Sequence, residues 1–477
     1  MSKIHEECGV MGIWSPRNEN VARKVYYGLY ALQHRGQESC GIVVNDDGLF
    51  NSYRDAGLVN DVFTPRVLKR LGTGTMAVGH VRYGTTGNDA RVNAQPIVVN
   101  HVKGRMALAH NGNLTNSAQL RENLELEGSI FHTTSDTEVI SYIITKNRLV
   151  TGSIEQAVSA AVDTIKGAYS LVIMSPSKLI CARDPHGFRP LCIGELPDGG
   201  YVFASESCAI DAVGGKLLRD VEPGEIVVVG KDGLKSDKTH CGTAKKSMCV
   251  FEFIYFARPD SVMDGCSVHE ARLKAGAYLA KQYPIDADVV IGVPDSGIDA
   301  AIGYSKESGI PYEMGFIKNK YIGRTFISPD QKSRDEGVRI KLNPIISAVK
   351  GKRVILVDDS IVRGTTSGKI VKLLRDAGAK EVHMMSSAPR FLNPCYHGTD
   401  IDSRENLIAC HHTVEETAEI LGADSLGYLS VENVRKIADA SGMEFCTACF
   451  SGDYPTEISG CIKKNKFEYK ISENKGE

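Results

Sequence analysis

The sequence has no long apolar run, only one tryptophan among its 477 residues, and almost no net charge, at −2. A membrane-spanning helix needs about 18 consecutive apolar residues, and no segment approaches that length. The near-neutral balance gives no electrostatic reason to expect a nucleic-acid or membrane partner. The first twenty residues lack the apolar core of a secretory signal, so we expect a cytoplasmic protein.

The composition that is present, 42% hydrophobic and 24% charged residues, is typical of a globular protein. The length allows more than one domain at roughly 150 residues each. Thirteen cysteines are many for a reducing compartment, and their odd number argues against a purely disulfide framework. We expect most of them to be small buried side chains, with Cys8 and a group toward the C-terminus as exceptions.

The first half of the chain alternates short β-like runs with two helical stretches, 21–34 and 136–147. Ser135 precedes the second stretch as an expected N-cap, and Glu138 follows it three residues on, which is the spacing of a capping box. This pattern favours stacked sheets covered by helices. The polar, lysine-rich segment 231–248 is typical of a connection between domains.

The second half follows a different pattern. Residues 288–293 and 353–357 each contain a continuous apolar run after one charged residue, and a turn and a helical pattern follow each of them. Buried parallel strands of a βαβ fold have this signature. We expect further helices at 413–421 and 431–440.

The strongest local signal is RVILVDDSIVRGTTSGK, residues 353–369, in which Asp358 and Asp359 end an apolar strand before a glycine- and hydroxyl-rich turn. Ligands of open α/β sheets bind beyond the carboxyl ends of the strands. Backbone N–H groups at a helix N-terminus favour a phosphate, and carboxylates accept hydrogen bonds from ribose and help to hold Mg²⁺. The acids and hydroxyls could instead only cap a turn and a helix, but the combination favours phosphate binding.

This stretch closely resembles the phosphoribosyl pyrophosphate motif of type I phosphoribosyltransferases. The resemblance implies a parallel-sheet domain over residues 250–477, with the segment VVIGVPDSG (289–297) as its pyrophosphate loop. It implies Mg²⁺ ligation by Ser296, Asp358 and Asp359. The residues that it assigns to phosphoribosyl pyrophosphate are Asp295, Ser296, Asp358, Asp359, Ser360, Arg363, Gly364, Thr365, Thr366 and Ser367.

The segment Lys318–Lys341 carries seven basic residues against three acids. It could be a solvated basic face. Beside an expected diphosphate, a lid that closes over the anion is the better interpretation.

Cys8 begins a β-like run near the chain start, and a cysteine in such a place is more often a core residue than a nucleophile. Its surroundings, however, resemble the N-terminal-nucleophile glutamine amidotransferases. The resemblance implies a four-layer αββα sandwich over residues 8–240 and removal of residues 1–7 as a propeptide. Five ordered segments carry it: CGV (8–10), LQHRGQ (32–37), GHVRYGTT (79–86), HNGNL (110–114) and SDTE (135–138).

Amide cleavage needs a thiolate, a base and donors aimed at the oxyanion. The resemblance implies that Cys8 is the nucleophile, activated by its own α-amine, and that Asn111 and Gly112 form the oxyanion hole. Taken singly, these residues have simpler readings, such as a hairpin turn at 111–112. The residues implied to contact glutamine are Arg35, Arg82, Tyr83 and Asp136, with His80 in a supporting role.

The pair Cys446 and Cys449 forms a C-x-x-C sequence, which occurs in zinc sites, redox pairs and iron–sulfur sites. In one branch of the resembling amidotransferases a short propeptide accompanies a [4Fe–4S] cluster. That branch implies ligation by Cys249, Cys395, Cys446 and Cys449, with Cys410 and Cys461 as substitutes and zinc as the alternative metal.

Together the two halves resemble the amidophosphoribosyltransferases, which transfer ammonia from glutamine to phosphoribosyl pyrophosphate at the entry to purine synthesis. The resemblance implies feedback by purine nucleotides and a homo-oligomer, either a dimer or a tetramer. Two other functions share part of these motifs. An amidotransferase with another acceptor disagrees with the motif at 353–369, and a regulator that senses phosphoribosyl pyrophosphate would need a basic DNA-binding element that the sequence lacks.

Overall fold

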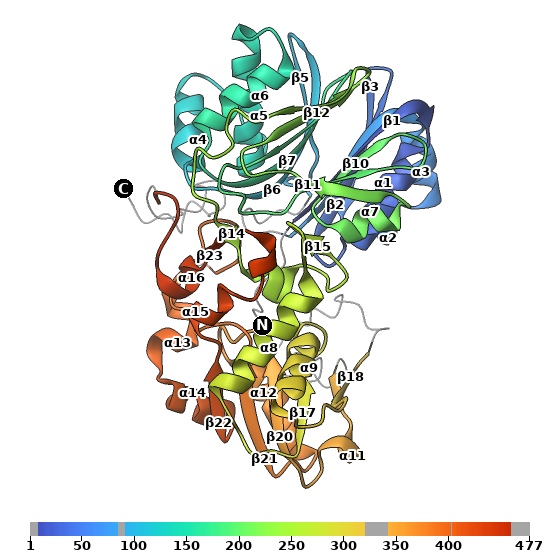
Figure 1. The fold of residues 1–477 in the computed structure, drawn as a ribbon. Helices are drawn as coiled ribbons and strands as arrows, with labels where there is room; N and C mark the ends of the chain where they lie inside the picture. The colour runs from blue at the N-terminus through green and yellow to red at the C-terminus, as the bar shows by residue number, and fades with distance from the viewer. Residues whose placement is uncertain (1–7, 84–90, 320–341, 402, 459–477) are drawn as a thin grey trace, which may run out of the picture.

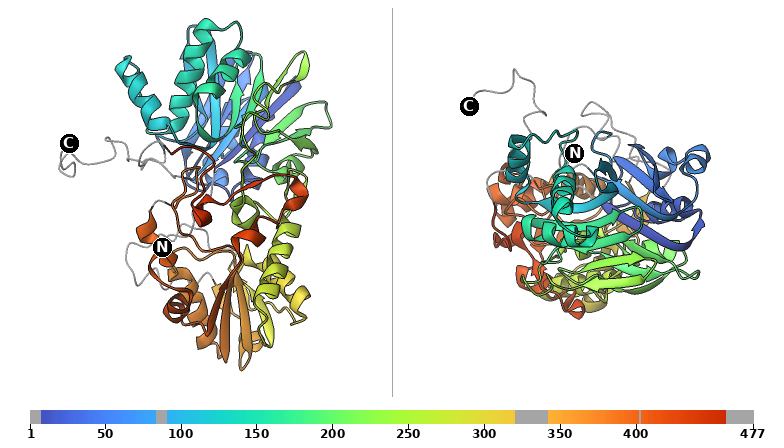
Figure 2. Two further views of the ribbon diagram at one scale, coloured as in Figure 1. Left: turned by 60° about the vertical axis from the view of Figure 1, so that its left-hand side comes forward. Right: turned by 90° about the horizontal axis from the view of Figure 1, so that it is seen from above.

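The computed structural model describes residues 8–83, 91–319, 342–401 and 403–458. It divides into a β-rich lobe, formed by the first half of the chain, and an α/β lobe formed by the second half (Figure 1). The short strands β14 (Met248–Cys249) and β23 (Phe445–Cys446) lie where the two lobes meet (Figure 1). The same two lobes are seen from the side in Figure 2. The expected propeptide 1–7, the expected lid beyond Asn319 and Cys461 lie outside the described residues.

The β-rich lobe contains two antiparallel sheets. The first has the order β11-β9-β10-β1-β4-β2-β3, and the second has the order β13-β12-β8-β7-β6-β5. The strands of the first are β1 (Gly9–Glu19), β2 (Ser39–Asp46), β3 (Leu49–Ala56), β4 (Gly74–Arg82), β9 (Cys192–Glu195), β10 (Tyr201–Ala204) and β11 (Lys216–Asp220). Those of the second are β5 (Ile97–His101), β6 (Gly104–Leu114), β7 (Gly167–Met174), β8 (Leu179–Arg183), β12 (Ile226–Gly230) and β13 (Gly233–Asp237).

The side chains of β1 show how the layers form. Val10 points into the core between the two sheets, which it shares with Ala109 of β6. Met11 and Ile13 point the other way and pack under helix α1 (Val21–Ala31). Helices α5 (Asp136–Val150) and α6 (Ile154–Thr164) cover the outer face of the second sheet. The expected αββα sandwich is therefore confirmed.

Helix α5 starts where the sequence predicted but with different capping. The Ser135 side chain accepts a hydrogen bond from Thr137 N, so the predicted N-cap is confirmed. The Glu138 carboxylate does not close a capping box; it accepts bonds from the backbone N–H groups of His132 and Thr133. The preceding loop offers these donors because it folds back over the first turn of the helix.

The α/β lobe is built on a parallel sheet of order β17-β20-β21-β22, so the two predicted parallel strands are confirmed. Helices α8 (Val268–Gln282) and α9 (Gly297–Ser308) cover one face, and α12 (Thr365–Asp376) and α14 (Val414–Leu421) cover the other. The strands are β17 (Val289–Gly292), β20 (Arg353–Asp358), β21 (Glu381–Ser386) and β22 (Ser425–Tyr428).

Two expectations need correction. The helix predicted at 431–440 is only a short turn, α15 (Val431–Val434), followed later by a 3-10 turn (Asp439–Ser441). Its apolar residues Val434, Ile437 and Ala438 are nevertheless fully buried. The spacing of apolar residues therefore indicated which residues are buried, but not a continuous helix. The segment 231–248 is only partly a connection, because its residues 233–237 form β13 and pair with β12.

The other elements are short. In the first lobe they are α2 (Val59–Val62), α3 (Pro65–Leu71), α4 (Ser117–Leu126) and α7 (Ser207–Ala212). In the second they are the π-helix η1 (Glu252–Phe256), β15 (Val262–Met263), β16 (Cys266–Ser267), β18 (Phe316–Lys318), β19 (Leu342–Pro344), α11 (Ile346–Val349), η2 (Arg404–Asn406), α13 (Ile408–His411) and α16 (Ala448–Ser451). Every helix in the described ranges is too short or too polar to span a bilayer.

Candidate active site

Cys8 lies directly before β1, at the end of the strand that pairs with the last residues of β4. Its Sγ donates to the carbonyl oxygen of Tyr83 at 3.7 Å, and its own carbonyl accepts from Arg35 Nε at 3.1 Å. The thiol therefore lies at the amino-terminal end of a central strand of the first sheet, and its backbone is held by an arginine.

The expected oxyanion donors lie near the end of β6, in the second sheet. Gly112 has a φ of +139°, and a Cβ there would lie 2.1 Å from Ala168 O, so only glycine fits. The Asn111 side chain is buried, and its Nδ2 has no hydrogen-bond partner among the described residues. A buried donor without a partner costs stability, and an oxyanion would satisfy it.

The residues implied to bind glutamine have different surroundings. Arg82 ends β4, is buried, and has Nη1 3.7 Å from Glu38 Oε2. The Asp136 carboxylate begins α5 and accepts from Leu114 N at 3.0 Å. Burial opposes the ionisation of Asp136, but His110 and the accepted hydrogen bonds outweigh it and hold its pKa below the usual value. Asp136 is thus an anion, which suits an ammonium group.

His80 is completely buried between β1 and β2. Burial, with a smaller effect of nearby Arg82, lowers its pKa to about 3, so the ring is neutral near pH 7. Its Nε2 donates to His110 O at 3.0 Å, since a carbonyl only accepts. His80 therefore links the two facing sheets behind the expected site.

Arg35 is 1% exposed, and both terminal nitrogens of its guanidinium donate to carboxylates. Nη1 donates to Glu206 at 2.7 Å, and Nη1 and Nη2 donate to Glu252 at 2.9 and 2.8 Å. The resemblance implied that Arg35 contacts glutamine, but this geometry favours a role in holding Cys8. A motif match identifies a residue and not the direction of its side chain.

The phosphoribosyl residues meet in one cavity of about 270 Å³ at the carboxyl edge of the parallel sheet. The loop after β17 and the loop after β20 are neighbours there because the two strands pair directly. Gly364 has a φ of +74° and caps α12. Lining the cavity are all ten residues that the resemblance assigned to the ligand: Asp295, Ser296, Asp358, Asp359, Ser360, Arg363, Gly364, Thr365, Thr366 and Ser367.

Asp359 is the centre of the polar contacts in this cavity. Its carboxylate accepts from Ser296 Oγ at 2.5 Å and from Ser360 Oγ at 2.5 Å, and its N–H donates to Asp358 Oδ1 at 2.9 Å. Lys318 forms an ion pair with Asp295 at the rim. Carboxylate and hydroxyl oxygens are the ligands that Mg²⁺ prefers, so Ser296, Asp358 and Asp359 fit that ion.

Several residues of the cavity wall were not singled out in the sequence. They are His34 from the first lobe, the segment Tyr255–Pro259 at the end of the π-helix and directly after it, and Arg272 of α8. His34 lies within the LQHRGQ segment, but nothing in that segment indicates that it reaches a site made by the second half of the chain.

The four cysteines implied to bind a cluster lie together where the lobes meet. Cys249 and Cys446 are directly opposite in the β14–β23 pair. Burial, then the neighbouring Cys395, raises the pKa of Cys446 to about 12. Burial likewise raises the pKa of Cys449, and the charges of Cys395, Cys249 and Cys446 raise it further. A bound metal would relieve this cost, because it favours thiolates.

Four neighbouring thiols are the complement that a [4Fe–4S] cluster requires, so this donor set fits the group. In the described ranges, no three His, Cys, Asp or Glu side chains are arranged to hold a single metal ion. Cys410, one of the two substitutes, donates instead to Leu392 O at 3.4 Å.

Known families match both lobes. Residues 80–212 match the model described as a glutamine amidotransferase domain, and residues 268–396 match a phosphoribosyl transferase domain. The amidophosphoribosyltransferase of Archaeoglobus fulgidus is 49% identical over 95% of this chain and 99% of its own. That of Bacillus subtilis is 48% identical over 95% of both chains.

Solved structures agree. The glutamine phosphoribosylpyrophosphate amidotransferase of B. subtilis, in complex with ADP and GMP, has a TM-score of 0.87 and 47% identity, over 95% of this chain and 98% of that one. A structure described as the allosteric regulatory enzyme of purine biosynthesis has a TM-score of 0.88 and 45% identity, over 97% and 99%. With such similarity over nearly its whole length, this chain belongs to the amidophosphoribosyltransferase family, the enzymes of the first step of purine synthesis.

Proposed function

We propose that the reaction runs at two sites, in domains formed by residues 8–240 and 250–477. Glutamine loses ammonia at Cys8, and the ammonia attacks C1 of phosphoribosyl pyrophosphate to give phosphoribosylamine and pyrophosphate. The observation that carries this assignment is that all ten residues expected to bind the sugar phosphate line one cavity, which His34 of the first lobe also reaches. Release of pyrophosphate that depends on glutamine tests it; release at the same rate without any nitrogen donor would contradict it.

At the glutamine site, Cys8 attacks the amide carbon and forms a glutamyl thioester. Arg82 clamps the α-carboxylate of glutamine, because a planar guanidinium fits a carboxylate, and Asp136 receives the α-ammonium. Tyr83 lines the same site next to the thiol. Arg35 holds the Cys8 carbonyl and is therefore assigned to positioning.

Asn111 and the Gly112 N–H stabilise the oxyanion. We expect Asn111→Ala to lower kcat with glutamine by about 10²–10³-fold, the usual effect of removing one oxyanion donor. Initial rates should be measured with glutamine and, separately, with an ammonium salt as the nitrogen source. The ammonium-dependent rate should stay near that of the wild type, because ammonia bypasses the oxyanion. An equal fall in both rates would show that Asn111 supports the fold instead.

Activation of Cys8 requires its free α-amine, which has an ordinary pKa of about 7.7–8.0 and can take the thiol proton near neutral pH. Residues 1–7 would therefore be removed as a propeptide. Intact-mass measurement of the purified enzyme tests this step. Full glutamine activity in protein that still carries Met1 or Ser2 would refute it.

At the phosphoribosyl site, the N-terminal turn of α12 receives the 5-phosphate, and Asp358 and Asp359 face the ribose. Ser296, Asp358 and Asp359 would hold Mg²⁺, which supplies neutralisation of the departing diphosphate when bound. The basic segment Lys318–Lys341 would close over the diphosphate; only Lys318 and Asn319 of it are described, and Lys318 already lines the cavity.

Cys249, Cys395, Cys446 and Cys449 would hold a [4Fe–4S] cluster with a structural or oxygen-sensing role, since the reaction moves no electrons. We expect anaerobically purified enzyme to contain about four iron atoms and four sulfides per chain. Elemental analysis with visible absorption checks this expectation. Zinc without iron would identify a zinc site instead.

The B. subtilis structure that this chain resembles holds ADP and GMP. We therefore propose that purine nucleotides bind this chain and inhibit it as feedback ligands. We also propose that the protein is a homo-oligomer in the cytoplasm.

A further inference from the structure

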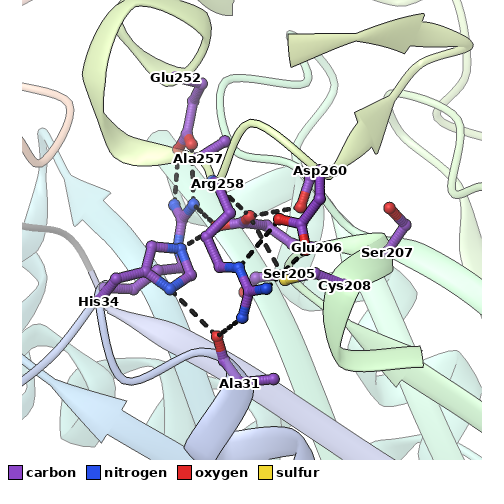
Figure 3. Close-up of polar contacts among 12 residues, drawn as sticks. Ala31, His34, Ser205, Glu206, Ser207, Cys208, Glu252, Ala257, Arg258 and Asp260 are labelled. Atoms are coloured by element: carbon purple, nitrogen blue, oxygen red, sulfur yellow. Dashed lines mark hydrogen bonds and ion pairs between the residues drawn. The ribbon is translucent and has the colours of Figure 1, made fainter. Parts of the chain in front are cut away.

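One segment of the second lobe, Glu252–Ser261, lines the phosphoribosyl cavity and also pairs with Arg35, the arginine that holds Cys8. It begins with the π-helix η1, and single-turn π-helices often occur at functional sites. Its residues Tyr255–Pro259 line the phosphoribosyl cavity. Its first residue, Glu252, points the other way, into the first lobe (Figure 3).

The Glu252 carboxylate holds two buried arginines. Arg35 donates to it from both terminal nitrogens, at 2.9 and 2.8 Å, and Arg189 Nη1 lies 3.4 Å from Oε1. All three side chains are 0% exposed. A charge so deep is stable only with its partners in place, which makes the geometry of this cluster well defined.

The first arginine leads to the nucleophile. Arg35 Nε donates to the carbonyl oxygen of Cys8 at 3.1 Å. The guanidinium is planar and rigid, so fixing Nη1 and Nη2 on Glu252 also fixes the direction of Nε. The position of the Cys8 backbone is therefore tied to a carboxylate of the other lobe.

The second arginine leads to the oxyanion strand. Arg189 Nη2 donates to His397 O at 2.6 Å. The next residue, Gly398, has a φ of +118°, and a Cβ there would lie 2.9 Å from Arg189 Nη2 and 3.4 Å from the Gly112 carbonyl carbon. In the same loop, Tyr396 O accepts from Asn113 Nδ2 at 2.9 Å. The loop thus rests against the strand that carries Gly112.

The far end of the segment is also fastened to Arg35. Glu206 accepts from Arg258 N at 3.0 Å, from Ser261 Oγ at 2.7 Å and from Arg35 Nη1 at 2.7 Å (Figure 3). Both ends of the segment are therefore linked to Arg35, the arginine that holds Cys8. Glu252 contacts Arg35 directly, and the end next to the phosphoribosyl cavity contacts it through Glu206.

We propose that Glu252 is a positioning residue for glutamine cleavage, supplied by the phosphoribosyltransferase lobe. Through Arg35 and Arg189 it sets the nucleophile and the oxyanion strand at the separation that the tetrahedral intermediate needs. The second lobe is then part of the glutamine site as well as the acceptor of its ammonia. This inference rests on the proposed assignment of Cys8, Asn111 and Gly112.

Glu252→Gln is the test, because it keeps the shape and removes the charge. We expect kcat with glutamine to fall about tenfold to a hundredfold, as a small misplacement of reacting groups does, while KM for glutamine changes little. The ammonium-dependent rate should stay near that of the wild type. The matched control is Glu225→Gln, a buried carboxylate of the first lobe that pairs with Arg219 away from both sites, and it should retain both activities.

Unchanged glutamine turnover in Glu252→Gln, or an equal loss of both activities, would overturn the proposal. If this variant does not fold, Arg189→Lys replaces it, because lysine keeps the charge but cannot bridge His397 and Glu252 as a planar guanidinium does. The same selective loss of glutamine turnover is expected for Arg189→Lys. Unchanged glutamine turnover, or an equal loss of both activities, would overturn the proposal here too. Cys8→Ala, assayed alongside, separates the two ideas. If Cys8→Ala keeps glutamine-dependent activity, the assignment of Cys8 as the nucleophile is refuted. If Cys8→Ala loses this activity while Glu252→Gln keeps it, only the role of Glu252 is refuted.

Discussion

Cys8→Ala is expected to lose glutamine-dependent synthesis by roughly 10⁴-fold or more, because removing a covalent nucleophile stops acyl transfer almost completely. Synthesis with an ammonium salt should continue near the wild-type rate. The phosphoribosyl cavity is lined mainly by the second lobe, so free ammonia would reach it without the thiol. Steady-state rates with each nitrogen source measure both expectations on one preparation.

The control is Cys181→Ala. Cys181 is a free cysteine of the same lobe, buried in the core between the two sheets and remote in function from the proposed site. It should lose some stability but keep both activities. If Cys8→Ala retains glutamine-dependent synthesis, the nucleophile is another group.

Asp359→Asn is expected to lower synthesis from both nitrogen sources by about 10²–10³-fold, because it removes a charge that would hold Mg²⁺ and orient the sugar in the proposed site. Asp359 accepts from Ser296 and Ser360, so the substitution also loosens the loop after β17. The expected signature is a parallel loss of glutamine-driven and ammonium-driven pyrophosphate release.

The matched control is Asp288→Asn, at the amino end of β17, opposite to the cavity. Its carboxylate accepts from the backbone and side chain of Arg353, which keeps its pKa low, at about 2, in an exposed pair. Losing such an exposed pair changes stability little, so both activities should persist. Comparable losses of activity in Asp359→Asn and Asp288→Asn would mean that activity depends on the stability of the sheet as a whole and not on the residues at its carboxyl edge.

Much of the fold follows from local sequence. Residues 289–292 of β17 and 354–357 of β20 are apolar because helices cover both faces of their sheet. The same reasoning failed at 431–440, where Ile437 and Ala438 are buried without a continuous helix. Periodicity reports which residues are buried more reliably than it reports the backbone that buries them.

The arrangement of the candidate site was predictable where one segment carries it, as in the run from Asp358 to Ser367, most of which lines one cavity. What the sequence could not reveal are the contacts between distant segments. His34 reaches a cavity of the second lobe, and Glu252 joins Arg35 to Arg189 across the lobe boundary. No local pattern marks such residues, because their roles depend on which segments the tertiary fold brings together.

The central claim is that one chain moves the amide nitrogen of glutamine to C1 of phosphoribosyl pyrophosphate. The most direct test supplies glutamine labelled with nitrogen-15 in its amide and measures glutamate, pyrophosphate and the labelled amine together. We predict equal amounts of all three, with the label in the product. Pyrophosphate released without matching glutamate, or a product without the label, would contradict the account.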